Sequence, residues 1–136
     1  MLATALLHDV TREEAVERLL AALPEFAPDY EESDGRPIEP GDAVLLHVVM
    51  GDLARFYMRH RLCDPELAVR FWRVVEELAA EGDQAVENAV WVSLIEWFAW
   101  GDDDEKAALV EAGPLQGPKT KSIRAYYLLP DEEPPR

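Results

Sequence analysis

Residues 64–101 read DPELAVRFWRVVEELAAEGDQAVENAVWVSLIEWFAWG, and this stretch decides the fold. Its first three residues predict a helix start, because an acid can cap the helix, proline takes the first helical position and a second acid lies in the first turn. Apolar residues then recur at helical spacing. We expect Gly82 to end this helix as a left-handed cap.

A second helix is predicted to begin directly after Gly82. Asp83 is a suitable N-cap, and the helix runs to about Trp100, where Gly101 closes it. Because the connection is so short, the two helices are expected to lie antiparallel as a helical hairpin.

Four further segments carry helical periodicity or helix caps, and no segment outside them alternates with the period of a strand. These segments cover residues 11–23, 42–62, 104–112 and 117–128. The predicted fold is therefore all-α, with about six helices in a compact array of antiparallel hairpins.

The helix over residues 42–62 is the candidate for the buried centre of the fold. Asp42 is a plausible cap, and residues 43–50 are predicted to be buried because apolar side chains surround the helix there. Gly51 weakens this helix by about 1 kcal/mol relative to alanine. We therefore expect a neighbouring helix to cross closely at Gly51.

The domain organisation follows from the proline-rich segments. Residues 24–40 combine four prolines with six acids and are predicted to form a long loop, with a helical turn near residues 26–30. Residues 1–129 are interpreted as a single helical domain, and the proline-rich and acidic residues 130–136 as a disordered tail.

The chain is strongly acidic, with 28 Asp and Glu against 13 Lys and Arg among 136 residues and a net charge of −15. Such a charge opposes binding to nucleic acids and to anionic membranes. No basic leader or membrane-length apolar run is present, and the single cysteine suits a reducing compartment. A cytoplasmic protein is expected.

Two segments carry a resemblance to known helical proteins. Residues 64–100 resemble a HEAT-like helical hairpin, in which an acid caps a helix with spaced Val, Ala and Leu. The wider chain is similar to small uncharacterised bacterial all-helical proteins that have a Gly-Pro-Lys/Arg-Thr turn before the last helix, here Gly117-Pro118-Lys119-Thr120. The resemblance implies a role in protein interaction.

Candidate catalytic residues are few. His60 and Cys63 share a helix face next to Asp64, so a cysteine nucleophile with a histidine base is one interpretation. The other is that Cys63 is a small buried apolar residue at a helix end. A polar set around His47 and Asp52 is a further candidate for a small hydrolase or transferase. No metal-binding motif or phosphate loop is present, so we predict neither a metal nor another cofactor.

The four tryptophans, Trp72, Trp91, Trp97 and Trp100, are expected to lie in the core rather than to form a stacking platform for bases. One alternative assigns the chain a structural role, in which it self-associates through an exposed face of Trp91, Ile95 and Phe98.

The acidic residues are concentrated in two regions, since residues 1–34 and residues 82–112 each carry a net charge of −7. If the fold brings these regions together, their field would attract a basic partner. The leading hypothesis is therefore a non-enzymatic module that binds a basic protein, in the manner of an immunity protein or antitoxin. We expect the partner to contact acidic residues, with Tyr30 and Trp100 as aromatic anchors; the acids are Glu25, Asp29, Glu31, Glu32, Asp102, Asp103 and Asp104.

Overall fold

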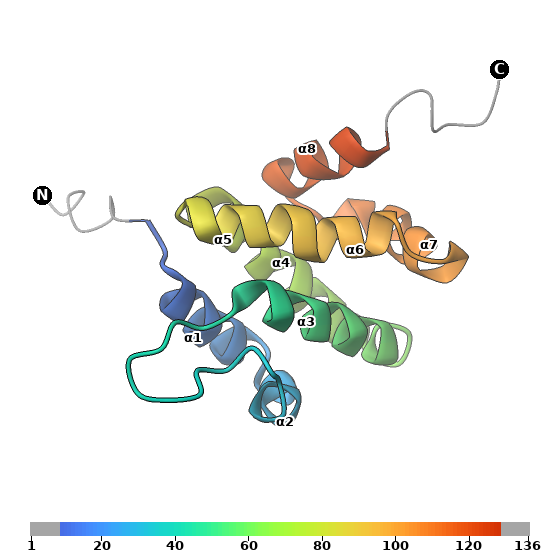
Figure 1. Cartoon of the computed structure of the whole chain (residues 1–136). Helices are drawn as coiled ribbons and strands as arrows, with labels where there is room; N and C mark the ends of the chain where they lie inside the picture. Colours follow the sequence, from blue (N-terminus) through green and yellow to red (C-terminus); the bar gives the residue numbers. More distant parts are fainter. Residues whose placement is uncertain (1–8, 129–136) are drawn as a thin grey trace, which may run out of the picture.

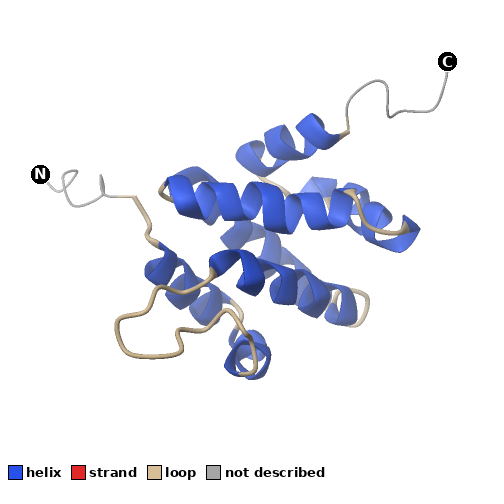
Figure 2. Cartoon of the chain, viewed as in Figure 1, coloured by secondary structure: helices blue, strands red, loops and turns tan. Residues whose placement is uncertain are grey.

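The computed structural model describes residues 9–128, and within this range the chain forms helices joined by loops and turns, with no strand (Figure 2). The predicted tail at residues 130–136 lies outside the described range. The α-helices are α1 (Arg12–Ala22), α2 (Ala27–Glu31), α3 (Leu46–His60), α4 (Pro65–Glu81), α5 (Gln84–Ala89), α6 (Glu96–Ala99), α7 (Asp103–Glu111) and α8 (Pro118–Tyr127). Other helical turns are η2 (Pro24–Phe26), η3 (Val90–Ile95) and η4 (Gly113–Leu115). The prediction of an all-α fold is confirmed.

The helices pack around one long element. The segments α5, η3 and α6 follow one another without a break and form a continuous helix across the middle of the fold (Figure 1). Helix α3 packs along one side of this element, and α8 lies on the opposite side in Figure 1. Helix α4 lies behind them and contacts both α1 and α8, so it links the first and the last helix of the described chain.

Aromatic side chains fill the space between α3, α4 and α6. Trp72 is fully buried, and its indole N–H donates a hydrogen bond of 2.8 Å to the hydroxyl of Tyr57. The ring of Tyr57 lies 4.2 Å from that of Phe71 and 5.8 Å from that of Phe98, measured between centroids. Such a cluster combines apolar burial with favourable ring geometry, so it stabilises the packing of these three helices.

The boundaries of α4 follow the sequence prediction with one correction. The carboxylate of Asp64 accepts a hydrogen bond from the backbone N–H of Leu67, and the next helix is capped in the same way by Asp83. Gly82, however, has φ −70° and ψ 153°, which is extended backbone, so the expectation of a left-handed cap is wrong. A Cβ on Gly82 would lie 2.5 Å from the carbonyl oxygen of Leu78. Glycine is required there for space rather than for a positive φ.

Helix α3 differs from its prediction at three points. It begins at Leu46 rather than at Asp42, whose carboxylate instead accepts a hydrogen bond from the N–H of Glu39 in the preceding turn. Leu45 and Val48 are exposed, so residues 43–50 are not buried on every side. No helix crosses closely at Gly51, where an added Cβ would meet only the guanidinium of Arg55, at 3.6 Å.

The segment η3 is a π-helix in the middle of the long element. The backbone N–H of Glu96 bonds to the carbonyl of Trp91, five residues earlier in the chain. π-Helical turns are rare and occur often at functional sites. The sequence prediction contained no such feature, because hydrophobic spacing does not distinguish one widened turn from regular helix.

The start of α8 is held by a side chain of α4. The carboxylate of Glu76 accepts hydrogen bonds from the backbone N–H groups of Lys119 (3.0 Å) and Thr120 (2.9 Å), and from the hydroxyl of Thr120 (2.9 Å). The Gly-Pro-Lys-Thr turn of the sequence therefore opens the last helix as expected, but its cap comes from a residue more than 40 positions away.

Candidate functional site

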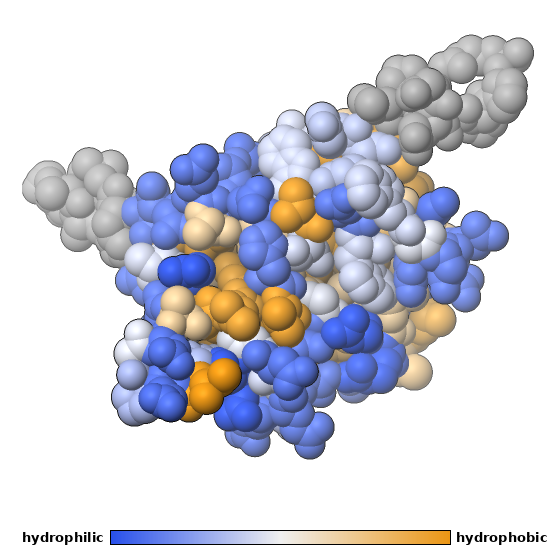
Figure 3. Space-filling view, in the orientation of Figure 1, coloured by the Kyte–Doolittle hydropathy of each residue, from blue (hydrophilic) through white to orange (hydrophobic). Residues whose placement is uncertain are grey.

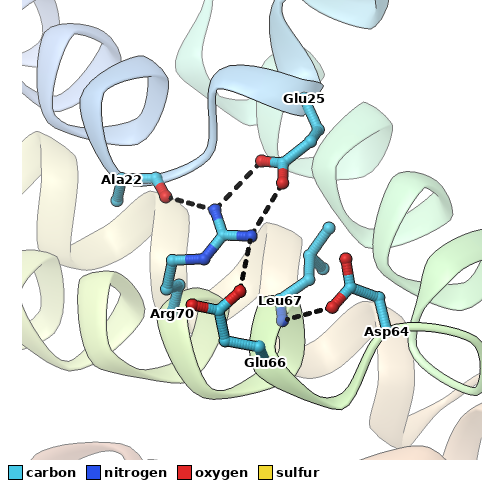
Figure 4. Close-up of polar contacts among 6 residues, drawn as sticks. All are labelled: Ala22, Glu25, Asp64, Glu66, Leu67 and Arg70. Carbon is cyan, nitrogen blue, oxygen red and sulfur yellow. Dashed lines mark hydrogen bonds and ion pairs between the residues drawn. The ribbon is translucent and has the colours of Figure 1, made fainter.

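Glu25, the first predicted contact residue, is already engaged within the fold. The guanidinium of Arg70 donates to both carboxylate oxygens of Glu25, at 3.0 and 2.7 Å, and to the backbone carbonyl of Ala22 at 2.9 Å (Figure 4). These hydrogen bonds lower the pKa of Glu25 from 4.5 to about 2. The pair fastens the end of α1 to α4, and Glu66 lies 3.8 Å from the same guanidinium.

This pairing predicts an acid-sensitive contribution to stability. The pKa of Glu25 is lower in the folded protein than in the unfolded chain, so its stabilisation is complete above pH 4.5 and declines toward pH 2. Because the carboxylate is partly exposed, we expect the contribution at neutral pH to be about 1 kcal/mol. Urea unfolding of wild type and Glu25→Gln should differ by this amount at pH 7 and converge near pH 2. A difference that persists near pH 2 would contradict this assignment.

Asp29 is also paired, because its carboxylate contacts the guanidinium of Arg59 on α3. Asp29, Arg59, Asp52 and Arg55 line a polar cavity of about 360 Å³ between α2 and α3. Two of its acids, Asp29 and Asp52, pair with arginines, whereas Glu32, which also lines the cavity, has no cationic partner among residues 9–128. Tyr30 is half-buried and packs against the core.

Glu31 and Glu32 lie exposed at the end of α2, and neither has a cationic partner among residues 9–128. They are the only predicted contact acids of residues 24–40 for which the described structure provides no arginine or lysine.

The acids at the start of α7 have two different roles. Asp102 caps the helix by accepting a hydrogen bond of 2.8 Å from the N–H of Glu105, and Glu105 accepts one of 2.8 Å from the N–H of Asp102. Asp103 and Asp104 lie exposed in the first turn, where they complement the helix dipole. None of these carboxylates pairs with a cation in the part of the chain that the structure describes.

Trp100 stands at the end of α6, directly before these acids, and is 70% exposed. The expectation that all four tryptophans lie in the core is therefore wrong for Trp100, while Trp72 is fully buried and Trp91 and Trp97 are partly buried. The ring of Trp100 packs edge-on against Tyr127 of α8, with centroids 5.8 Å apart. This contact holds one edge of the indole and leaves most of its surface open to solvent.

A groove of about 550 Å³ runs from Trp100 along the junction between α3 and the long helix. Its lining residues are His47, Gly51, Val92, Ser93, Glu96, Trp97, Trp100, Gly101 and Glu105. The π-helix η3 supplies Val92 and Ser93 to this lining. The groove thus combines two indole rings, two carboxylates and a small polar group in one depression.

Two side-chain contacts order the groove. The Nδ1 atom of His47 lies 2.5 Å from the hydroxyl oxygen of Ser93, which connects α3 to η3. The hydroxyl of Tyr127 lies 3.3 Å from the carbonyl oxygen of Trp91 and 3.4 Å from a carboxylate oxygen of Glu96, so its one O–H donor is shared between these acceptors. Burial, with Glu96 as a further cause, raises the pKa of Tyr127 to about 12. Tyr127 therefore remains a neutral donor that positions Glu96 at physiological pH.

Apolar surface extends from the groove over the neighbouring helix. Leu45, Val48 and Val92 are exposed, and Figure 3 shows hydrophobic surface gathered over the start of α3 and over the middle of the long helix. Exposed apolar surface next to polar residues is typical of protein–protein contact sites.

The catalytic candidates are not assembled into a site in the described structure. Cys63 is exposed rather than buried, and the ring of His60 packs on Phe56 with centroids 4.6 Å apart. His47 contacts Ser93 but no carboxylate among residues 9–128. A serine or cysteine nucleophile requires a base that a third group orients. No group of three or more metal-ligating side chains occurs within the described range.

The proposed self-association face is not available. Ile95 and Phe98 are fully buried, and Trp91 packs against Tyr126 of α8, with centroids 5.4 Å apart. Helix α8 therefore packs on the helix face that the sequence analysis expected to be exposed. No helix in residues 9–128 is long and apolar enough to cross a membrane.

Comparison with known families gives a match over residues 16–128 to the family described as Domain of unknown function (DUF7674). The chain belongs to the DUF7674 family. Neither the curated proteins nor the solved structures contain a match to this chain. The whole groove, from His47 to Glu105, lies inside the matched range.

The groove of this DUF7674 domain contains residues that the sequence prediction missed. Glu96, Trp97 and Glu105 line it together with Ser93, but only Trp100 of its lining was a predicted contact residue. The signal in the sequence was weak, because Glu96 and Trp97 lie in a helix whose many apolar residues predict a buried element. Burial of Ile95 and Phe98 beside them turns both side chains toward the groove.

The two acidic regions of the DUF7674 domain touch where Val10 pairs with Gly82 and α1 packs against α5, but the predicted contact acids on α2 and at the start of α7 lie apart. Helix α2 and helix α7 are at separate places in the fold, and α3 passes between them (Figure 1). Arg55 and Arg59 of α3 pair with Asp52 and Asp29. At the corner between α6 and α7, several carboxylates without a cationic partner among residues 9–128 adjoin the groove beside Trp100.

Proposed function

We propose that this DUF7674 protein is a non-enzymatic binding module that holds a basic protein at the groove beside Trp100. The observation that carries the proposal is an indole 70% exposed at the mouth of a groove of about 550 Å³ whose carboxylates have no cationic partner among residues 9–128. In its concrete form the module acts as an immunity protein or antitoxin and covers the active surface of a cationic toxin.

Charge supports a basic partner. Glu96 and Glu105 line the groove, and Asp102, Asp103 and Asp104 follow Trp100 directly in the chain. A cluster of uncompensated carboxylates lowers the energy of an approaching cationic surface and raises the association rate. The net charge of −15 extends this attraction beyond the groove.

Packing supports a protein rather than a small ion as the occupant. Exposed tryptophan is the residue type most enriched among the energetically dominant positions of interfaces. The apolar side chains Leu45, Val48 and Val92 continue the surface away from the carboxylates. An interface would therefore have an apolar centre and an acidic edge, which is the usual arrangement.

We expect Trp100→Ala to weaken binding of the partner about tenfold, because truncation removes the largest exposed contact at the groove. Immobilised wild-type protein captures the partner from the source cells at low salt, the partner is identified by mass spectrometry, and its purified form is titrated by calorimetry. The affinity should fall steeply between about 0.05 and 0.5 M salt.

The matched control is Glu31→Gln/Glu32→Gln, which removes two exposed charges on α2 and leaves the groove intact. This variant should bind the purified partner within about twofold of wild type. A partner that is neutral or acidic, or that binds Trp100→Ala as tightly as wild type, would count against the proposal.

A further inference from the structure

The groove contains two kinds of group that recognise organic cations in different ways. The indoles of Trp97 and Trp100 present π-systems, which attract a cation lying over a ring face. The carboxylates of Glu96 and Glu105 attract a cation and can also accept hydrogen bonds from it. The indoles and the carboxylates line the same groove, so one cationic side chain of a partner can contact both at the same time.

The carboxylates are held in place before any ligand arrives. One oxygen of Glu105 accepts the N–H of Asp102 at 2.8 Å, and Glu96 accepts the hydroxyl of Tyr127 at 3.4 Å. In each case the acceptor is one oxygen, Oε1, and the second oxygen has no partner among residues 9–128. A fixed acceptor loses little side-chain freedom on binding, which favours a ligand with several directed donors.

Guanidinium fits this combination better than ammonium does. It is planar, so it stacks on an indole face while its five N–H donors point outward in the plane toward carboxylates. The lysine ammonium is a compact, strongly hydrated charge, so it loses more hydration at the ring and has no planar face to stack on the indole. Trimethylated lysine would use the rings but has no N–H to donate to the carboxylates.

Resting on the proposed function, we infer that the groove between α3 and the α6–α7 corner is an arginine-binding site. It takes one arginine side chain of the basic partner against Trp100, with its guanidinium hydrogen-bonded to Glu96 and Glu105. His47 and Ser93, which contact each other, line the same groove. The partner is then a protein whose contact surface presents an arginine rather than only a high density of lysine.

The test compares two peptides of equal charge, hexa-arginine and hexa-lysine, titrated against the full chain by calorimetry and by tryptophan fluorescence. We expect hexa-arginine to bind about five- to tenfold tighter than hexa-lysine. Trp100→Ala should remove this preference. Glu96→Gln/Glu105→Gln should weaken hexa-arginine about fivefold, although glutamine preserves the capping interaction of residue 105.

The control is again Glu31→Gln/Glu32→Gln, which changes the net charge by the same amount and should leave the preference for arginine intact. Equal affinity for both peptides, with loss of both on Trp100→Ala, would overturn the arginine site but leave the basic-partner proposal standing. If Glu96→Gln/Glu105→Gln and Glu31→Gln/Glu32→Gln weaken hexa-arginine binding equally, binding depends on net charge alone, and this result would also overturn the arginine site. If the purified partner binds Trp100→Ala with the same affinity as wild type, the proposed function itself would be overturned.

Discussion

Replacing Trp72 with alanine is expected to lower the free energy of unfolding by about 3–5 kcal/mol, the cost typical of deleting a large aromatic side chain from a core. Trp72 is fully buried, and rings from three other residues surround it, with centroids at 5.4 Å for Tyr57, 4.8 Å for Phe71 and 5.9 Å for Phe98. These rings come from α3, α4 and α6, so the cavity would open where three helices meet. The hydroxyl of Tyr57 would also lose the indole donor at 2.8 Å.

Urea unfolding followed by circular dichroism measures this effect, and Trp72→Phe keeps the experiment informative if the alanine variant does not fold. The phenylalanine variant retains a ring but loses the hydrogen bond, and we expect a cost of about 1–2 kcal/mol. Trp100→Ala is the matched control, because the same residue type is removed from a position that is 70% exposed. Its stability should stay within about 0.5 kcal/mol of wild type. Equal losses at positions 72 and 100 would contradict the placement of the two indoles.

Local signals in the sequence were sufficient for most helix boundaries. The caps at Asp64 and Asp83 and the Gly-Pro-Lys-Thr turn at the start of the last helix all appear in the structure where the sequence placed them. Each of these signals acts within one turn of backbone, so nothing distant in the chain was needed to interpret it.

Features that depend on tertiary packing were not predictable in the same way. Gly82 has the residue type of a left-handed cap but adopts extended backbone, because Val10 pairs with it in a short bridge and Val86 packs against it. The start of α3 moved to Leu46 because its preceding residues follow the loop from α2: the N–H of Leu45 bonds to the carbonyl of Gly35. Periodicity carries no information about such contacts.

The candidate site also combines features that local sequence signals predict with features that only tertiary contacts determine. Sequence reasoning named Trp100 as an aromatic anchor and the acids after it as contact residues, although it also expected the tryptophans to lie in the core, and it counted Glu25 and Asp29 as available charges. Their partners, Arg70 and Arg59, are 45 and 30 residues away in the chain, so the pairing appears only in the fold. The groove has the same origin, since His47 and Ser93 come together across 46 residues.

The start of α8 is capped by one carboxylate, and this makes Glu76 the second position with a large expected effect. The first backbone N–H groups of a helix have no partner within the helix. Here Glu76 satisfies those of Lys119 and Thr120, and the hydroxyl of Thr120, which is itself fully buried. Gly117 is suited to this arrangement, because a Cβ there would lie 2.4 Å from Cδ of Glu76.

Glu76→Ala is therefore expected to lower the free energy of unfolding by about 2–3 kcal/mol, since it leaves a buried hydroxyl and two backbone donors without their acceptor. Glu77→Ala is the matched control: Glu77 lies 3.6 Å from Arg18 at the surface, and its loss should cost less than about 0.5 kcal/mol. Amide hydrogen exchange gives the decisive readout, because α8 should lose protection in Glu76→Ala before α3 and α4 do. Unchanged protection in α8 would mean that the buried side chains of Ile123 and Tyr127 hold the helix without the cap.

The same variant should also weaken binding at the groove, because Tyr127 of α8 contacts both Trp100 and Glu96. Glu77→Ala should leave this binding unchanged.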